Sequence, residues 1–417
     1  MQAGWIRRTL AALVVAGATM VAASHSPATA APAGVDRPRP VRFATFNASL
    51  NRSAAGQLIA DLSTPANAQA ATVAEIIQRV RPDVLLINEF DYDADGLAAR
   101  LFQENYLSVA HDRAEPITYP HRYVAPSNTG IPSGHDLNNN GAVGGPDDAF
   151  GFGFFPGQFG MAVYSMHPIL LDDVRTFQRF LWADMPGALL PDDPATPAPA
   201  DWYSAEELAV FRLSSKSHWD LPIKIGRHTV HFLVSHPTPP VFDGPEDRNG
   251  RRNHDEIRFW ADYISRGQTP SYIYDDAGQR GGLEAGASFV IAGDMNADPL
   301  DGDSVPGAAQ QLLDHPRISS SAVPSSVGAA DAADRQGGAN LTHIGKPRFD
   351  TADFADSAPG NLRVDYVLPS RNLRVLDDGV FWPPSYSPLF RLVGDFPFPS
   401  SDHRLVWIDL AVPRDPR

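Results

Sequence analysis

The chain has 417 residues, no cysteine and a formal net charge of −15. The lack of cysteine excludes thiol nucleophiles and thiolate metal sites, and a chain of this length can build its core without disulfides. The acidic balance disfavours a tight DNA-binding protein, because affinity for a phosphate backbone comes mainly from Lys and Arg. It does not exclude a nuclease, since a local basic patch and metal ions can outweigh the overall charge.

The N-terminal segment has the layout of a secretory signal peptide. Arg7 and Arg8 precede an apolar run from Leu10 to Ala23, and Ala28-Thr29-Ala30 supplies a small-residue cleavage site. The apolar run is shorter than the roughly 20 residues that a membrane-spanning helix needs, and no later segment is long and apolar enough. We therefore expect residues 1–31 to be removed and the mature protein to be secreted and extracellular. The competing interpretation is an uncleaved N-terminal anchor.

After a Pro-rich linker over residues 32–40, strands and helices alternate through a predicted domain over residues 41–413. The spacing of one buried helix face occurs at Val73, Ile76, Ile77 and Val80, and again at Ile257, Trp260, Ala261 and Ile264. Pro82 ends the first of these helices before the predicted strand Val84–Asn88.

Four long stretches rich in Pro, Gly and Asp interrupt these elements, at 111–158, 183–205, 268–286 and 314–348. Loops of such length are uncommon unless they are functional or disordered.

Polar side chains flank six short apolar runs of strand type. The motifs are Phe43-Ala44-Thr45-Phe46-Asn47, Leu85-Leu86-Ile87-Asn88-Glu89, Phe232-Leu233-Val234-Ser235-His236, Gly293-Asp294-Met295-Asn296, Arg363-Val364-Asp365-Tyr366 and Ser401-Asp402-His403. A polar group at the point where a buried strand reaches the surface is well placed to line a catalytic cleft.

This ordered set resembles the endonuclease/exonuclease/phosphatase superfamily, which includes pancreatic-type DNases, abasic-site endonucleases, inositol polyphosphate 5-phosphatases and neutral sphingomyelinases. The resemblance runs from about residue 41 to residue 412. It implies an α+β fold, a four-layer α/β/β/α sandwich in which helices flank two packed, mainly antiparallel β-sheets. It also implies an active site at one end of the sandwich, with long loop insertions that adapt the substrate.

Glu89 is the leading candidate for a metal ligand. Phosphoester hydrolysis needs a hard cation against the non-bridging oxygens, and a carboxylate at the end of a buried strand, without a basic neighbour in sequence, needs a cation partner. The resemblance adds Asn47 and Asp402, and oxygen ligands favour Mg²⁺ or Mn²⁺. The alternatives are a Glu89 that faces water and an Asn47 that ends its strand in a turn. In the superfamily the Glu usually follows Gln, whereas Asn88 stands here.

Asp294 and Asn296 lie at i and i+2, so their side chains share one side if the strand continues. Asp294 could then orient and deprotonate the attacking water, while Asn296 holds the water or a phosphate oxygen. A turn after the strand is an alternative, and the two interpretations are compatible.

The resemblance implies that His236 and His403 contact the phosphate and that Asp365 orients His403. An imidazole beside a carboxylate has a raised pKa and can donate to the transition state as a cation. A surface histidine without a catalytic role is the alternative for each.

Two further features are open. The loop Asp136, Asn138, Asn140, Gly141, Val143 and Asp147 matches calcium-loop positions 1, 3, 5, 6, 8 and 12, and either structural Ca²⁺ or a solvated turn would explain it. A basic rim for an anionic substrate could come from Lys216, His218, Arg251, Arg252, His254 and Arg258, among which Arg252 is favoured. The exposed face of an ordinary amphipathic helix is the alternative.

The sequence thus predicts a secreted, divalent-metal-dependent phosphoesterase whose substrate is nucleic acid or a small organophosphate. An extracellular nuclease is favoured. A phosphatase or phosphodiesterase acting on inositol phosphates or phospholipid head groups, and a non-catalytic binding module, are the alternatives. No protein partner is indicated.

Overall fold

The strands of the computed structural model, which describes residues 40–412, form two large sheets and one small sheet. The predicted signal peptide (1–31) and the predicted linker up to residue 39 lie outside the described residues. The strands are β1 (Val41–Leu50), β2 (Val84–Phe90), β3 (His121–Tyr123), β4 (Met161–Ser165), β5 (Arg175–Thr176), β6 (His218–Ile225), β7 (His228–Ser235), β8 (Ser288–Asp294), β9 (Ala352–Asp353), β10 (Asn361–Leu362), β11 (Asp365–Pro369), β12 (Arg374–Val380) and β13 (Val406–Ala411).

The α-helices are α1 (Gln57–Leu62), α2 (Ala68–Val80), α3 (Leu97–Phe102), α4 (Ala205–Leu208), α5 (Arg248–Tyr263), α6 (Gln310–Leu313) and α7 (Val327–Gln336). A π-helical segment, η1 (Gln103–Leu107), continues α3. The 3₁₀ segments are η2 (Pro146–Asp148), η3 (Leu171–Asp173), η4 (Trp182–Asp184), η5 (Thr269–Tyr272), η6 (Gly338–Thr342), η7 (Pro347–Phe349) and η8 (Pro388–Leu392).

Among the described strands, each large sheet is antiparallel apart from one parallel pair. The six-stranded sheet has the order β12-β13-β1-β2-β4-β3, in which β1 and β2 are parallel. The five-stranded sheet has the order β11-β8-β7-β6-β5, in which β7 and β8 are parallel. The prediction of two mainly antiparallel sheets is confirmed.

Alternating side chains along the strands build one core between the sheets and one on each outer face. In β7, Phe232 and Val234 join the core between the sheets, whereas Leu233 joins the outer core of the five-stranded sheet. In β2, Leu86 joins the core between the sheets and Leu85 joins the outer core of the six-stranded sheet. Since successive side chains of a strand point to opposite faces, both sheets are apolar on both faces and need helices outside them.

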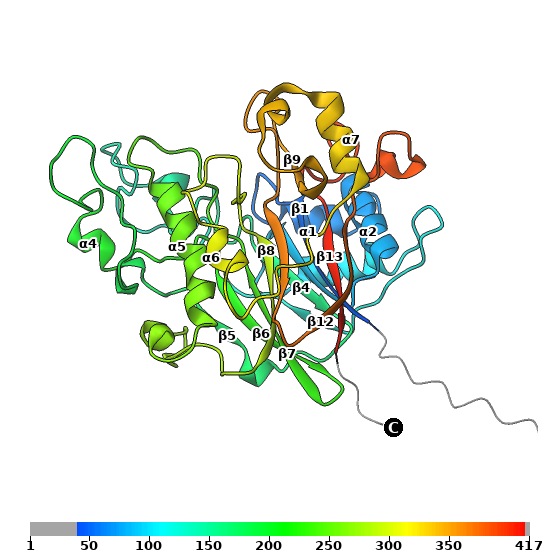
Figure 1. Cartoon of the computed structure of the whole chain (residues 1–417), viewed down its shortest axis with the longest axis horizontal. Coiled ribbons are helices and arrows are strands. Elements are labelled where there is room, and N and C mark those ends of the chain that lie inside the picture. Colours follow the sequence, from blue (N-terminus) through cyan, green and yellow to red (C-terminus); the bar gives the residue numbers. More distant parts are fainter. Residues whose placement is uncertain (1–39, 413–417) are drawn as a thin grey trace, which may run out of the picture. The chain divides into compact units, whose positions relative to one another are not determined.

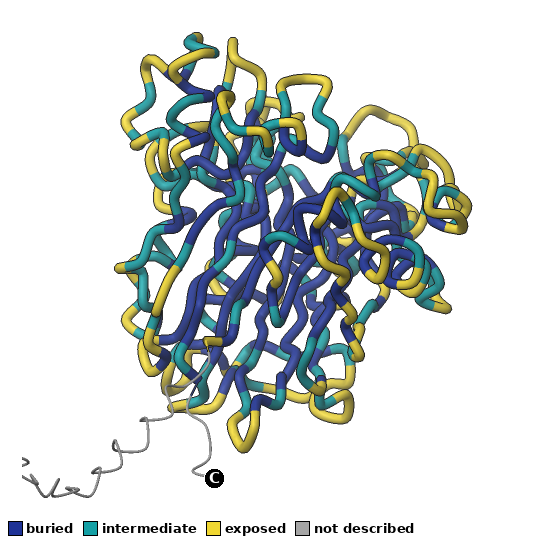
Figure 2. Tube along the Cα trace, turned by 90° about the vertical axis from the view of Figure 1, so that its right-hand side faces the viewer, coloured by how far each residue is buried: buried dark blue, intermediate teal, exposed yellow. Residues whose placement is uncertain are grey.

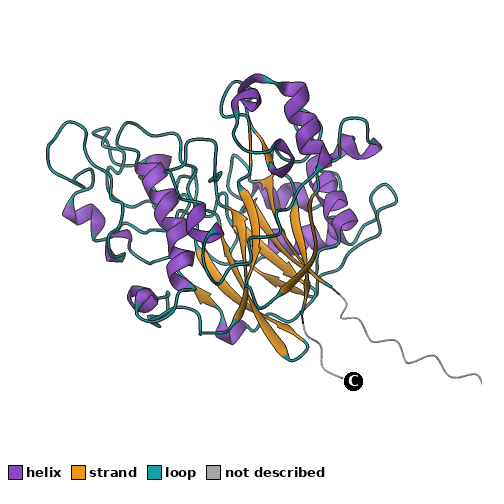
Figure 3. Ribbon diagram, in the orientation of Figure 1, coloured by secondary structure: helices purple, strands orange, loops and turns teal. Residues whose placement is uncertain are grey.

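Helices supply those outer layers. Ile76 and Ile77 of α2 pack on the six-stranded sheet, and Ile257 and Trp260 of α5 pack on the five-stranded sheet. Figure 1 shows α1 and α2 on one side of the strands and α5 and α6 on the other. The strands lie between the helices (Figure 3), and the central strands are mostly buried (Figure 2). The predicted four-layer α/β/β/α sandwich is confirmed.

Both predicted helix faces are confirmed. α2 begins after Asn67, whose side chain accepts a hydrogen bond from the Ala70 N–H at 2.9 Å, the usual N-cap interaction. It ends at Arg81, which adopts a left-handed conformation with a φ of 54°. Between residues 40 and 412, no helix is both long and apolar enough to cross a membrane.

The fourth predicted insertion is not a continuous loop. Residues 314–348 contain α7, whose Ala329 and Ala332 pack on the core between the sheets. Ser326 caps this helix by accepting a hydrogen bond from the Ala329 N–H at 3.0 Å. Sequence alone misses α7 because alanine, rather than large apolar side chains, forms its buried face, so the amphipathic pattern is weak.

We expect Phe232→Ala to lower the free energy of unfolding by about 3–5 kcal/mol, the usual cost of a buried Phe-to-Ala truncation. Phe232 is fully buried between the sheets, and its ring centroid lies 5.5 Å from that of Phe43. The measurement is urea unfolding. Phe242→Ala is the control, because Phe242 is 86% exposed and its loss should change stability by no more than about 0.5 kcal/mol. Equal effects of the two substitutions would contradict this description of the core.

Candidate active site

Polar side chains from both sheets meet at one end of the sandwich. Parallel pairing of β1 with β2, and of β7 with β8, brings the carboxyl ends of each pair to the same edge of its sheet. The predicted site residues on these and neighbouring strands are Asn47 in β1, Glu89 in β2, His236 after β7, Asp294 at the end of β8, Asp365 at the start of β11 and His403 before β13.

Asp294 is the centre of this group. Its Oδ2 accepts a hydrogen bond from Asn47 Nδ2 at 3.0 Å, and the Nε2 atoms of His236 and His403 lie 3.4 and 3.6 Å from that oxygen. The Asn296 N–H donates to Oδ1 at 2.9 Å. Burial alone would raise the pKa of this carboxyl, but the charge of His403 and the contacts with His236 and Asn47 outweigh burial and lower it. Asp294 is therefore ionised at neutral pH.

The backbone around Asp294 fits only a small residue before it. A Cβ at Gly293 would lie 2.1 Å from the carbonyl oxygen of Ser235 in β7, so glycine is required by this close approach. Asn88 of the other sheet accepts a hydrogen bond from the Asp294 N–H at 3.3 Å and donates to the Ser235 oxygen at 3.4 Å. Asn88, at the position where Gln is usual, thus ties β2 to β7 and β8.

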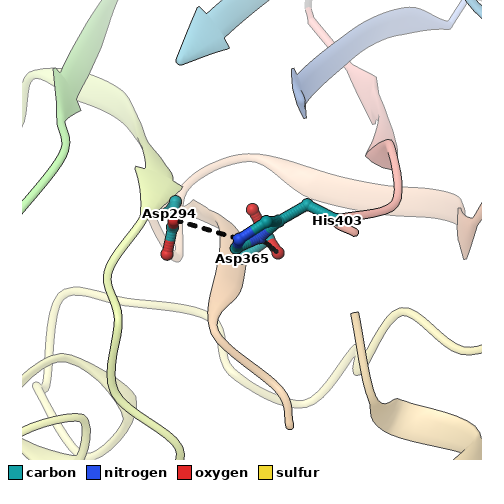
Figure 4. A group of neighbouring side chains, drawn as sticks. All are labelled: Asp294, Asp365 and His403. Carbon is teal, nitrogen blue, oxygen red and sulfur yellow. Dashed lines mark hydrogen bonds and ion pairs between the residues drawn. The ribbon is translucent and has the colours of Figure 1, made fainter. Parts of the chain in front are cut away.

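His403 forms a buried pair with Asp365. Its Nδ1 lies 2.9 Å from Asp365 Oδ2, and its Nε2 faces Asp294. Figure 4 shows the imidazole reaching toward both carboxylates. Burial alone would lower the pKa of His403, but the charges of Asp365 and Asp294 outweigh burial and raise it well above the ordinary value. The ring is therefore a cation that donates to Asp365 through Nδ1 and forms an ion pair with Asp294 through Nε2.

Thr351 orients Asp365 and carries no sequence signal. Its hydroxyl donates to Asp365 Oδ2 at 2.8 Å and accepts hydrogen bonds from the Val364 and Asp365 N–H groups at 3.0 and 2.9 Å. The segment is anchored to the end of the chain, since the Arg404 N–H donates to the Thr351 carbonyl at 2.8 Å. A lone threonine after an irregular stretch could be singled out only from such contacts.

The orientation of the Glu89 side chain is set by an irregularity in the pairing of β1 with β2. The register shifts between Asn47 and Leu50, and both Ser49 and Glu89 adopt left-handed backbone conformations, with φ of 48° and 57°. Bulges of this kind re-aim a side chain near functional sites. The Glu89 carboxylate accepts hydrogen bonds from Asn47 Nδ2 at 3.2 Å and Asn51 Nδ2 at 2.6 Å.

His236 and Asn296 complete the site on the five-stranded sheet. Burial, followed by the nearby charge of Lys216, lowers the pKa of His236, so this ring is neutral at neutral pH, in contrast to His403. Its Nδ1 is buried and has no hydrogen-bond partner among the described residues. Asn296 has a φ of 51° and donates from Nδ2 to the Pro237 carbonyl at 3.1 Å, so the predicted turn and a place beside Asp294 coexist.

Two groups of ligand atoms could hold a divalent cation. Asp294, Asp365 and His403 each offer a ligand atom, and these atoms lie within 4.8 Å of one another. An imidazolium paired with both carboxylates also explains that arrangement. Glu89, by contrast, accepts only from neutral amides, and no cationic side chain among residues 40–412 forms an ion pair with it. A carboxylate left with its full charge suits a hard cation with oxygen ligands.

Asp402, the third predicted metal ligand, is bound by serine hydroxyls. Its carboxylate is half-buried and accepts from the hydroxyls of Ser49 and Ser401 at 3.4 and 3.3 Å. Within residues 40–412 no hydrogen bond joins it to the side chain of Asn47 or Glu89. The Ser401 hydroxyl donates to the Asn47 carbonyl at 2.8 Å, so Asp402 is near β1 through Ser401.

The predicted calcium loop is a turn closed by its own amides. Asp136 accepts from the N–H groups of Asn140 and Gly141 at 3.0 and 2.7 Å, and Asn138 accepts from Asn140 at 3.1 Å. The carboxylate that closes the loop is Asp148, which accepts from Leu137 and Gly144 N–H groups at 2.8 Å each. Asp147 makes none of these closing contacts, and its role as a calcium ligand stays a prediction.

Arg252 does not lie on an exposed basic rim. Its side chain is 6% exposed, and its guanidinium donates to the carbonyls of Leu213, Phe150 and Arg212 at 2.8, 2.5 and 3.0 Å. Three carbonyls thus accept three of the five N–H donors of this guanidinium inside the fold. The helical spacing that placed Arg252 on α5 could not show that loops cover this face of the helix.

The chain is similar to known proteins in sequence and in fold. Residues 44–403 match a family model described as the endonuclease/exonuclease/phosphatase family. The comparison with curated proteins returned no match.

The chain is also similar to several solved structures at low identity. An endonuclease/exonuclease/phosphatase from Beutenbergia cavernae is 18% identical over 89% of this chain and 71% of that chain, with a TM-score of 0.48. A mannosyl-6-phosphatase from Bacteroides thetaiotaomicron is 12% identical over 89% of this chain and 99% of that chain, with a TM-score of 0.42. Sphingomyelinase C from Streptomyces griseocarneus is 13% identical over 89% and 99% of the two chains, with a TM-score of 0.41.

We expect Asp365→Asn to lower the pKa of His403 by about 1 or more, because a neighbouring opposite charge shifts a pKa by that much. The measurement is an NMR titration of the His403 ring protons, assigned with His403→Ala. Asp136→Asn, remote in the turn, is the control and should leave the titration unchanged. Because the pKa of His403 is raised in the folded state, its protonation stabilises the fold fully below pH 6.5, the ordinary pKa of histidine. This stabilisation is lost as the pH rises through the raised pKa. The stability difference between wild type and Asp365→Asn should therefore shrink at high pH, and an unchanged His403 titration would contradict the pair.

Proposed function

Because the chain belongs to the endonuclease/exonuclease/phosphatase family, we propose that it is a divalent-metal-dependent phosphoesterase that uses water as its nucleophile. The observation that carries this proposal is the ionised, buried Asp294 carboxylate, which is contacted by Asn47, His236 and His403. The Asn47 amide, the neutral His236 ring and the His403 imidazolium all contact Asp294 Oδ2. This arrangement suits a site that binds a nucleophilic water and an anionic phosphoryl group.

Glu89, with Asn47 beside it, would hold the catalytic Mg²⁺ or Mn²⁺. When bound, the cation would neutralise charge on the phosphoryl oxygens and lower the pKa of bound water. The fit rests on the Glu89 carboxylate, whose oxygens meet only amide donors, and on the oxygen-only donor set, which suits these ions.

Asp294 would accept a hydrogen bond from the attacking water and take its proton. Its negative charge orients the water before the proton moves, and Asn47 fixes the carboxylate through Oδ2. His403 would donate from Nε2 to a phosphoryl oxygen, because Asp365 holds Nδ1 and keeps the ring cationic. His236 is neutral and would donate a hydrogen bond to the leaving-group oxygen or another phosphoryl oxygen.

We further propose that the protein acts outside the cell as a nuclease-like hydrolase, after removal of residues 1–31. The signal-peptide pattern of Arg7, Arg8 and the apolar run after them supports secretion. Two observations favour a second candidate, a hydrolase of small phosphodiesters: the chain has a net charge of −15, and Arg252 is buried. Turnover of plasmid DNA, RNA, bis(4-nitrophenyl) phosphate, sphingomyelin and phytate in parallel tests the two candidates.

We expect Asp294→Asn and His403→Ala each to lower turnover by a factor of about 100 or more, as general bases and charge-stabilising donors typically contribute. Steady-state kinetics with the best of the five substrates is the measurement. His228→Ala is the control, because His228 is exposed at the start of β7. More than about a tenth of wild-type turnover in a folded Asp294→Asn variant would rule out the assigned role.

Metal removal gives a separate prediction. EDTA should abolish turnover, and added Mg²⁺ or Mn²⁺ should restore it. Glu89→Gln removes the charge that attracts the cation and should raise the metal concentration needed for half-maximal activity by about 10-fold or more, as loss of a metal-site group does. Asp172→Asn, at an exposed position in η3, is the control. Full activity in the presence of EDTA would contradict the metal-dependent mechanism.

A further inference from the structure

Lys216 is a buried lysine at the edge of the candidate active site. It lies just before β6, and only 7% of the residue is exposed. Its ammonium forms no hydrogen bond or ion pair with any side chain or carbonyl of residues 40–412. Lysine is almost never so fully buried unless its charge is paired, so this position calls for a partner.

Backbone contacts fix Lys216 beside His236. Glu256 of α5 accepts hydrogen bonds from the N–H groups of Ser215 and Thr238 at 2.6 Å each, so it holds the segment before Lys216 against the loop that follows His236. The Ser215 hydroxyl also donates to the His236 carbonyl at 3.2 Å.

A second segment closes on the other side. The Asn128 N–H donates to the Lys216 carbonyl at 2.8 Å. A Cβ at Gly151 would lie 1.9 Å from the Ser215 carbonyl oxygen, so the chain at Gly151 packs directly on this segment. The position of Lys216 is therefore set by the fold and does not depend on a flexible loop tip.

Two of the three carboxylates that act on Lys216 belong to the candidate active site. Burial lowers the pKa of its ammonium, and Glu256, Glu89 and Asp294 oppose that effect, in that order. Glu256 already receives a backbone N–H on each oxygen. The remaining negative groups are the proposed metal ligand and the proposed base, and Lys216 pairs with neither.

We propose that the ammonium of Lys216 binds a non-bridging oxygen of the substrate's phosphoryl group. The inference rests on the proposed function and adds a substrate-binding residue to that site. Lys216 is buried except for 7% of its surface, and a lysine charge in such a position is costly without an anionic partner. A phosphoryl oxygen bound in the candidate active site would supply that anion. Lysine binds phosphate as a point charge, which suits a single oxygen of either a phosphodiester or a phosphomonoester.

The test is the affinity of the purified protein for inorganic phosphate in saturating Mg²⁺, measured by calorimetry and as competitive inhibition of bis(4-nitrophenyl) phosphate hydrolysis. Lys216→Met should weaken phosphate binding by about 10- to 100-fold, the range for loss of a charged hydrogen bond, and should lower kcat/KM. Lys216→Arg keeps the charge and should bind phosphate more tightly than Lys216→Met does. Lys224→Met on β6 is the matched control, because Lys224 Nζ donates to the Arg227 carbonyl at 2.9 Å. It should behave as wild type.

Thermal melting confirms that each variant is folded, and Lys216→Gln replaces Lys216→Met should the latter fail to fold. The proposal is overturned if the Kd for phosphate of the folded Lys216→Met or Lys216→Gln variant lies within about twofold of the wild-type Kd, a difference of less than about 0.5 kcal/mol. A higher Mg²⁺ requirement with unchanged phosphate affinity also overturns it, because it would mean that Lys216 acts only on the metal site. If the wild-type protein hydrolysed none of the phosphoesters, the proposed function would be wrong. Calorimetry with inorganic phosphate would still decide the role of Lys216.

Discussion

A buried negative charge at Asp294 is the constraint on which the site depends. Taking a carboxylate out of water is costly unless donors surround it, and here Asn47, His236, His403 and the Asn296 N–H do so. Each donor belongs to a different segment of the chain, so the charge can persist only where both sheets meet. The same donors hold the carboxylate ionised and fixed in place, so that it can accept a hydrogen bond from the attacking water.

The sandwich provides that meeting point through strand direction. Each sheet contains one parallel pair, β1 with β2 and β7 with β8, and each pair ends in catalytic candidates. Asn88 crosses between the sheets with hydrogen bonds to Ser235 and Asp294. The bulge between Asn47 and Leu50 then leaves Glu89 in a left-handed conformation. Local strain of this kind is typical of functional sites, where surrounding structure holds it in place.

The two histidines show how the same side chain is set to different states. His403 lies between Asp365 and Asp294, and their charges raise its pKa despite burial. His236 is equally buried but lies near Lys216, and burial with that positive charge lowers its pKa. One ring can therefore supply a permanent cation and the other a neutral hydrogen-bond donor. Lys216 connects this electrostatic difference with substrate binding, because its charge acts on His236 while its own partner is missing.

The sequence by itself determined the strand-end motifs, their order and the helix faces of α2 and α5, because these depend on local spacing and on apolar periodicity. The four-layer sandwich was predicted from the family resemblance. Tertiary structure alone decided that Thr351 orients Asp365, that Asp148 closes the turn at Asp136, and that Arg252 is covered and Lys216 is not paired. These outcomes depend on contacts between segments far apart in the chain, which spacing cannot report. The burial of a charge, and hence its pKa and its need for a partner, is set only when those segments pack.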